Sequence, residues 1–224
     1  MVALGDSTTA PRRVGDRNLV VYADRLRDIF GPSGLTVINA GVGGNDTRLA
    51  SARFRKDVLD HQPRLAVVQF GINDAAVDVR LGRTDPRVPL AEFSATIRRM
   101  VETLMQALCR VILMTPNPMY WTPAMLELYG KPPYRPDDFD GFNVLLGSYA
   151  EAVRTVTRET GCVGLDVYGR YQALIGNRAA AVADYFLDGM HPNDRGHALV
   201  TELLTPVVDR LLQAIRNDGG RQAV

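Results

Sequence analysis

Short apolar runs alternate with amphipathic stretches along almost the whole chain, and this alternation limits the folds that the chain can adopt. The apolar runs consist of consecutive aliphatic or β-branched residues, which is typical of strands covered on both faces. They occupy residues 1–4, 35–39, 65–70, 110–115 and 162–167. Helical patterns fill residues 17–30, 48–60, 90–108, 141–160 and 194–216. Because strand–helix–strand crossovers are right-handed, the pattern predicts an α/β fold: a parallel sheet inside a three-layer α/β/α sandwich.

Length and composition indicate one globular domain. A chain of 224 residues is long enough to bury one substantial core, and its 46% hydrophobic and 23% charged residues are close to globular averages. The sequence contains no internal repeat, low-complexity tract or interdomain linker. We therefore expect a single domain over residues 1–216 and a flexible C-terminal tail over residues 217–224.

The net charge, the apolar runs and the cysteines indicate which partners, membrane segments and cross-links to expect. The net charge of +1 gives no reason to expect nucleic acid or an anionic membrane surface, and no stretch reaches the ~20 apolar residues of a membrane span. Cys109 and Cys162 fit no metal-ligand spacing, so free thiols are favoured over a disulfide. No signal-peptide pattern precedes Gly5. The default expectation is cytoplasmic localisation, with a leader removed upstream of Met1 as the alternative. Nothing indicates an oligomeric state.

Four polar, turn-forming segments lie next to strands or to the last helix of the predicted fold. We expect all four at one rim of the sheet. "GDST" (5–8), "AGVGGNDT" (40–47) and "GIND" (71–74) each follow a predicted strand, and "DGMHPN" (188–193) precedes the last helix. In open parallel sheets, ligands bind beyond the carboxyl ends of the strands. We therefore expect the chemistry of this protein at these segments.

Serine, histidine and aspartate in these segments suit nucleophilic catalysis. A serine hydroxyl needs a base, and histidine is the side chain best matched to neutral pH. Among the three histidines, His61 and His197 fall in a helix–strand junction and a helix. His191 lies in a turn three residues after Asp188, which is close enough for the carboxylate to reach the imidazole and fix its tautomer. The alternative is an ordinary loop followed by a helix N-cap.

An acyl-transfer site also needs donors for the developing oxyanion. Gly44 can present a backbone N–H where a side chain would block the approach. The amide of Asn73 and the backbone N–H of Ser7 complete the set. Glycine and asparagine are also common turn residues, so each position alone is weak evidence. Four separate segments each supply one part, and this coincidence favours the catalytic interpretation.

Together these segments resemble the four signature blocks of the SGNH hydrolases, also called the GDSL family. The residues on which the resemblance rests are Ser7 in "GDS", Gly44 in "GVGGNDT", Asn73 in "GIND" and His191 in "DGMH", in that order. The resemblance implies a flavodoxin-like five-stranded sheet of order 2-1-3-4-5. It also implies Ser7 as nucleophile, His191 as base and Asp188 as its partner, with Ser7, Gly44 and Asn73 forming the oxyanion hole. "GDSTT" lacks the leucine of the GDSL name, a variation that points to carbohydrate acetylesterases.

Other readings of these motifs fit less well. A dinucleotide fingerprint would place its third glycine at position 46, where the carboxylate of Asp46 would repel the pyrophosphate. No P-loop and no G-x-S-x-G elbow is present, and a metal site on Asp188 and His191 lacks a third ligand. We expect neither a metal nor another cofactor. A non-catalytic binding module is disfavoured because every catalytic position is filled.

Two long connections, residues 77–89 and 116–140, are candidates for shaping the substrate pocket. The second is rich in proline and aromatic residues, among which Tyr120, Trp121 and Tyr134 are candidate substrate-binding residues. The competing interpretation is an insertion whose aromatic side chains pack on one another. Neither connection has the long apolar stripe of a lipase lid. We therefore expect a serine esterase for short acyl esters, acetyl above all, on a small molecule or carbohydrate. The alternative is an acyltransferase that uses the same residues.

Overall fold

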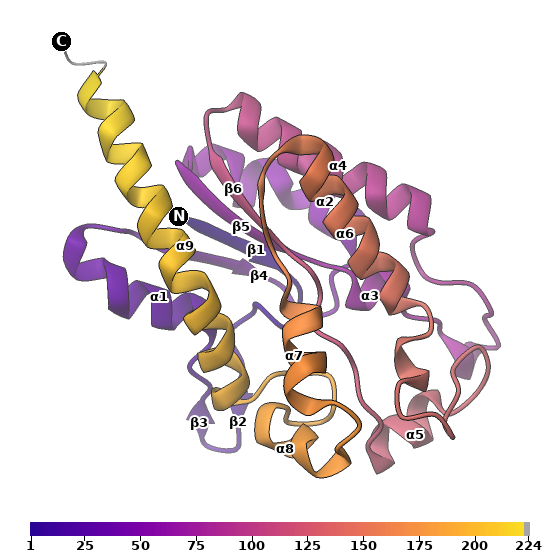
Figure 1. Ribbon diagram of the computed structural model, residues 1–224. Coiled ribbons are helices and arrows are strands. Elements are labelled where there is room, and N and C mark those ends of the chain that lie inside the picture. The colour runs from indigo at the N-terminus through magenta and orange to yellow at the C-terminus, as the bar shows by residue number, and fades with distance from the viewer. Residues whose placement is uncertain (222–224) are drawn as a thin grey trace.

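The computed structural model describes residues 1–221 and has a five-stranded parallel sheet at its centre (Figure 1). The strand order is β4-β1-β5-β6-β7, which confirms the expected order 2-1-3-4-5. Every neighbouring pair in this sheet is parallel. The strands are β1 (Val2–Gly5), β4 (Ile38–Gly41), β5 (Leu65–Gln69), β6 (Arg110–Met114) and β7 (Val163–Leu165).

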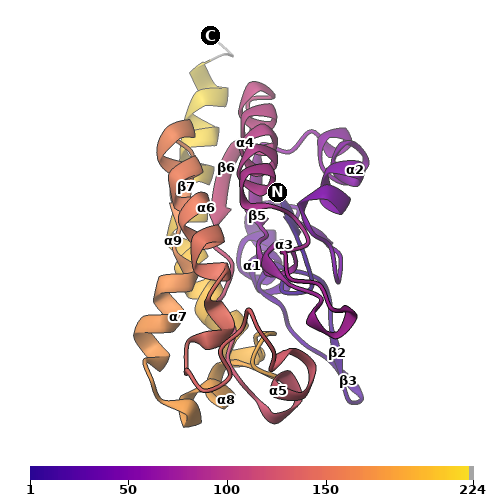
Figure 2. The same ribbon diagram turned by 90° about the vertical axis from the view of Figure 1, so that its right-hand side faces the viewer.

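Helices cover both faces of the sheet and bury two separate apolar cores. One core lies against α2 (Thr47–Asp57), α4 (Leu90–Gln106) and α6 (Leu146–Thr160), and the other against α1 (Tyr22–Phe30), α7 (Val167–Ile175) and α9 (Asp194–Arg221). Figure 2 shows α7 and α9 to one side and α2 to the other. In β1, Val2 and Leu4 point into the first core and Ala3 into the second. Consecutive apolar residues in the strands therefore reflect burial on both faces.

Several small elements were not predicted from the sequence. The hairpin β2 (Arg13–Val14) and β3 (Arg17–Asn18) follows β1, and α8 (Val182–Tyr185) precedes the "DGMH" segment. The aromatic connection contains α5 (Pro123–Tyr129), and α3 (Ile72–Ala75) follows β5. The hairpin, α5 and α8 all lie in the lower part of the molecule, on the side of the carboxyl ends of the strands (Figure 1).

The C-terminal helix is longer than the sequence pattern predicts. We expected a flexible tail from residue 217, but α9 continues to Arg221. A salt bridge between Arg110 at the start of β6 and Asp218, with a distance of 2.7 Å between nitrogen and oxygen, ties this last part of the helix to the sheet. Residues 222–224 of the expected tail lie outside the described residues. Within residues 1–221, no helix combines the length and the hydropathy of a membrane span.

Candidate active site

The structure brings Ser7, His191 and Asp188 together although the chain separates the first two by 184 residues. The hydroxyl oxygen of Ser7 lies 2.9 Å from Nε2 of His191, and Nδ1 of the same ring lies 2.7 Å from Oδ2 of Asp188. These distances are those of hydrogen bonds, and the order is that of a nucleophile, a base and a carboxylate that orients the base. The three residues can therefore move a proton away from the serine hydroxyl.

The environment of Asp188 keeps this carboxyl ionised. Its Oδ1 accepts hydrogen bonds from the backbone N–H groups of Met190 and His191, at 3.0 and 2.8 Å. Burial alone would raise the pKa of Asp188, but these bonds and the bond from the His191 ring lower that pKa to about 2. At neutral pH a negative charge therefore faces Nδ1 of His191. This charge favours a proton on Nδ1 and leaves Nε2 free to accept the proton of Ser7.

Ser7 lies on a tight turn that follows β1 directly. The backbone N–H groups of Thr9 and Ala10 both donate to the carbonyl of Asp6, at 3.2 and 3.0 Å. The carboxylate of Asp6 is buried and accepts from the N–H and the hydroxyl of Thr8, both at 2.8 Å. A Cβ on Gly5 would lie 2.1 Å from Oγ1 of Thr9, so only glycine allows the turn to fold back on the strand. The turn thus presents Ser7 at the rim of the sheet.

Gly44 lies in the loop after β4 and Asn73 in the short helix α3 after β5, and these two strands flank β1. Gly44 has a φ of 75°, a left-handed conformation that favours glycine, while the space beside its Cα is open. The backbone conformation therefore favours glycine here, and the expectation that a side chain would block the approach to this N–H stays a prediction. The amide nitrogen of Asn73 donates to the carbonyl of Asn45 at 3.0 Å, so α3 and the loop after β4 are joined next to Gly44.

Two further aspartates hold these loops in place. Oδ1 of Asp74 accepts from the N–H and the hydroxyl of Thr47, at 2.8 and 2.5 Å, which ties the loop of Asn73 to the start of α2. Burial raises the pKa of Asp74 to about 6. Asp46 caps the N-terminus of α2 by accepting from the N–H of Leu49 at 2.9 Å. These carboxylates therefore bind loop backbones and hydroxyls beside the candidate site.

The aromatic connection, residues 116–140, binds the segment that carries His191. The carbonyls of residues 188–190 accept hydrogen bonds from the hydroxyl of Thr122, the N–H of Tyr120 and the amide of Asn117, at 3.1, 2.8 and 2.9 Å. Sequence reasoning missed this support because it consists mostly of backbone groups, which leave no motif. The aromatic connection therefore holds the histidine loop in place.

The three aromatic candidates for substrate binding differ in their surroundings. Tyr120 and Tyr134 are only 2% and 3% exposed, and the hydroxyl of Tyr134 accepts from the N–H of Val77. Trp121 is half-buried, and its ring stacks on Phe142 with 4.4 Å between the centroids. In this conformation the aromatic side chains pack mainly on one another. Only Trp121 keeps a substantial exposed surface, and its contact with substrate stays a prediction.

The remaining histidines and the cysteines lie apart from this arrangement. His61 lies in the short 3₁₀ helix that precedes β5, on the side of the amino end of that strand. His197 is buried in α9, where its Nδ1 accepts from the N–H of Tyr22 and burial lowers its pKa to about 3. Cys109 and Cys162 are free thiols, as expected. Among residues 1–221, no three His, Cys, Asp or Glu side chains form a group suited to a metal ion.

Comparison with known proteins identifies the family. Residues 3–199 match the GDSL-like Lipase/Acylhydrolase family. The chain belongs to this family. The match extends from β1 into α9 and therefore includes every segment of the candidate site. The protein is accordingly an esterase or acylhydrolase with an SGNH-type α/β fold.

Three curated relatives show the range of proteins that the chain resembles. The lipoprotein YqeF of Bacillus subtilis is 27% identical over 90% of this chain and 86% of its own length. An acetylxylan esterase of Geobacillus stearothermophilus is 25% identical over 78% of this chain and 73% of its own. The mouse isoamyl acetate-hydrolyzing esterase 1 homolog is 29% identical over 80% of this chain and 71% of its own.

Solved structures share the fold. The lipase/acylhydrolase from Enterococcus faecalis superposes with a TM-score of 0.68 at 24% identity, covering 92% of this chain and 93% of that one. Axe2, an acetylxylan esterase from Geobacillus stearothermophilus, gives a TM-score of 0.69 at 22% identity, covering 91% and 90%. At these identities the superpositions establish the architecture of the sheet and its helices.

Proposed function

We propose that this esterase uses Ser7 as its nucleophile and hydrolyses short-chain acyl esters, above all acetyl esters, through an acyl-serine intermediate. The observation that carries the proposal is the chain of two hydrogen bonds from Ser7 through His191 to Asp188. Such a chain activates a hydroxyl whose own pKa is far too high for attack at neutral pH. No metal or organic cofactor takes part in the proposed chemistry.

The reaction proceeds in two balanced halves. In the first, the oxygen of Ser7 attacks the ester carbonyl while Nε2 of His191 takes the hydroxyl proton. The tetrahedral oxyanion is held by the N–H groups of Ser7 and Gly44 and by the amide of Asn73. The carbon–oxygen bond to the alcohol then breaks, and His191 returns its proton to the leaving alcohol. In the second half, water attacks the acyl group, His191 again carries the proton, and the acid leaves with Ser7 restored.

The proposed acyl group follows from the relatives and from the aromatic connection. Two of the curated relatives are named for acetyl esters, of xylan in one case and of isoamyl alcohol in the other. They share the acetyl group and differ in the alcohol, so the acetyl group is the more transferable part of the substrate. The aromatic connection packs on itself and forms no long apolar lid, which agrees with a short acyl chain. A polar alcohol such as an acetylated sugar is the class that we propose.

The test is an activity screen over acetylated sugars, short alkyl esters and acyl thioesters, with Ser7→Ala as the blank. We expect Ser7→Ala to fold normally and to lose turnover, and a p-nitrophenyl ester series to favour acetyl. Full activity of Ser7→Ala would end the serine mechanism. A preference for acyl chains longer than about six carbons would end the short-chain assignment.

The same residues would also support an acyltransferase, in which an alcohol or amine intercepts the acyl-serine in place of water. Water access to the intermediate decides between the two outcomes. Product partitioning between free acid and acylated acceptor, measured with added sugar or amine acceptors, separates them. We expect free acid to predominate.

A further inference from the structure

The side chain of Arg53 in α2 binds several backbone and side-chain oxygens beneath the candidate site. It is 16% exposed. Its Nη2 donates to the carbonyl of Gly5 at 3.1 Å, its Nη1 to the carbonyl of Ala40 at 2.7 Å, and its Nε to Oδ1 of Asn45 at 2.7 Å. Nη1 also pairs with Asp57 at 3.0 Å, one turn further along the helix. One guanidinium group therefore binds three strand-end or loop segments at once.

The partners of Arg53 are the segments that carry the reacting groups. Gly5 ends β1, two residues before Ser7. Ala40 lies in β4, from which the chain runs into the loop of Gly44. Asn45 follows Gly44 directly, and its carbonyl is the acceptor of the Asn73 amide. Arg53 thus connects the nucleophile strand directly to the loop of Gly44, and through Asn45 to Asn73.

We propose that Arg53 is a positioning residue that fixes the oxyanion hole relative to Ser7. The inference rests on the proposed serine esterase mechanism and adds to it a residue outside the four sequence blocks. Electrostatic stabilisation of an oxyanion depends on donors that are already in place, and a displacement of about 1 Å can lower a rate about a hundredfold. Arg53 does not touch the reacting atoms. It acts through Gly5 and Asn45.

Arginine suits this role for a geometric reason. Its guanidinium is a rigid plane that donates in several fixed directions, whereas the ammonium group of lysine is a compact charge on a flexible stem. A lysine at position 53 would keep the positive charge near Asp57 but could not bind Gly5, Ala40 and Asn45 together. The charge alone is therefore insufficient, and the conservative replacement tests the geometry.

The experiment measures kcat and KM of Arg53→Ala and Arg53→Lys on p-nitrophenyl acetate, with kcat divided by the number of active sites from the p-nitrophenol burst. Normalisation matters because a merely structural role would reduce the number of active molecules and leave kcat per active site unchanged. We expect kcat per site to fall about tenfold to a hundredfold in both variants, with KM within about twofold of the unmodified protein. Arg55→Ala, an exposed arginine on the same helix, is the matched control and should keep its kcat.

Asn45→Ala provides a second measurement that leaves Arg53 in place. Because the side chain of Asn45 would act through its bond to Arg53, the double variant should be no slower than Arg53→Ala alone. The proposal is overturned if kcat per site of Arg53→Ala stays within about threefold of the unmodified protein, or if Arg53→Lys restores it. Should Arg53→Ala fail to fold, a kcat of Asn45→Ala within about twofold of the unmodified protein overturns the proposal by itself. Ser7→Ala, assayed alongside, separates this failure from failure of the mechanism, which requires that variant to be inactive.

Discussion

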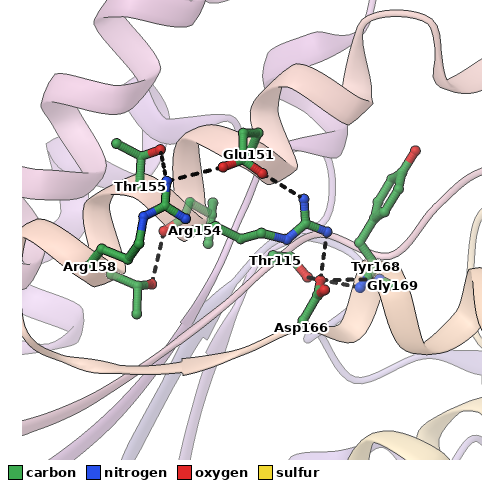
Figure 3. A network of polar contacts seen from close by, with 10 residues as sticks. Thr115, Glu151, Arg154, Thr155, Arg158, Asp166, Tyr168 and Gly169 are labelled. Carbon is green, nitrogen blue, oxygen red and sulfur yellow. Dashed lines mark hydrogen bonds and ion pairs between the residues drawn. The ribbon is translucent and has the colours of Figure 1, made fainter.

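Two arginine-centred networks lie toward opposite edges of the same sheet and differ in the groups that they bind. Arg53 binds backbone carbonyls and an amide at the ends of β1 and β4. Beyond β6 and β7, Arg154 donates to Asp166 at 2.9 Å and to Glu151 at 3.1 Å, and Arg158 donates to Glu151 at 3.2 Å (Figure 3). The first network therefore joins loops to strands, whereas the second joins charged side chains to one another.

Burial accounts for the different consequences of the two networks. The side chain of Arg53 is 16% exposed, while those of Asp166 and Glu151 are 49% and 55% exposed. Exposed ion pairs are screened by water and salt and contribute little to stability, whereas buried donors hold their acceptors in one geometry. We therefore expect substitutions around Arg53 to disturb the candidate site more than substitutions in the exposed ion pairs beyond β7.

The largest expected effect on the catalytic side comes from Asp188→Asn. The asparagine amide would favour the wrong tautomer of His191, and such a change lowers kcat roughly 10⁴-fold in a comparable triad. We expect kcat to fall by about 10³- to 10⁴-fold, measured on p-nitrophenyl acetate with the fold checked by circular dichroism. Asp184, which lies nearby in sequence, pairs with Arg195 at 3.7 Å and is half exposed, so it should not replace Asp188. Asp184→Asn is the control, and we expect it to keep a normal kcat.

Asn73→Ala should have the next largest effect. Loss of one oxyanion donor costs about 3 kcal/mol of transition-state stabilisation, so kcat should fall by roughly 10²- to 10³-fold with a smaller change in KM. The matched change on the other side of the sheet is Thr115→Val, which removes a hydroxyl that donates to Asp166 at 3.2 Å. That variant should lose stability and keep its kcat. Equal losses of kcat in the two variants would contradict the division of the sheet into a catalytic and a tolerant side.

Buried and exposed carboxylates should also differ in the pH dependence of stability. Burial raises the pKa of Asp74 from 3.8 to about 6, so between these values the folded protein binds more protons than the unfolded chain. Ionisation of Asp74 therefore lowers the free energy of unfolding as the pH rises from about 4 to about 6, by up to about 3 kcal/mol. Urea unfolding at several pH values should show this loss in the unmodified protein relative to Asp74→Asn.

Ionisation of Asp166 should change the free energy of unfolding in the opposite direction. Burial opposes its ionisation, but the hydrogen bonds from Arg154 and from the N–H of Gly169 lower its pKa below 3.8. The stability that ionised Asp166 contributes to the folded protein is present above the pKa of the unfolded chain and is lost as the pH falls.

The prediction for Asp74 has its own contradicting outcome. A stability difference between the unmodified protein and Asp74→Asn that does not change between pH 4 and pH 6 would contradict the effect of burial on Asp74.

The sequence allowed prediction of the parts that are local in the chain. The parallel sheet and the four rim segments follow from apolar runs that end in turn-forming residues, and Ser7, Asp188 and His191 lie within those segments. The strand order was implied by the resemblance of these segments to the SGNH hydrolases. The contacts of Arg53 could not be predicted, because an arginine in a polar helix carries no sign of which carbonyls it meets. The same holds for the loop contacts of Asn117 and Thr122. The helical residues 217–221 were missed because the glycines there are poor helix formers, while the Arg110–Asp218 pair joins distant parts of the chain.

The smallest expected effect is that of Arg154→Ala, and it tests the tolerant side of the comparison. Its ion pairs are partly exposed, so their removal should lower the free energy of unfolding by no more than about 1 kcal/mol and leave kcat unchanged. The loss should shrink between low salt and about 1 M NaCl, where the Debye length falls to roughly 3 Å. Arg158→Ala, which loses only its contact with Glu151 and a bond to Thr155, should cost less still. Urea unfolding at both salt concentrations measures these differences. A drop of kcat in Arg154→Ala comparable to that of Asn73→Ala would mean that the β7 edge supports the catalytic geometry after all, because the change would then reach Ser7 through β6 and β5.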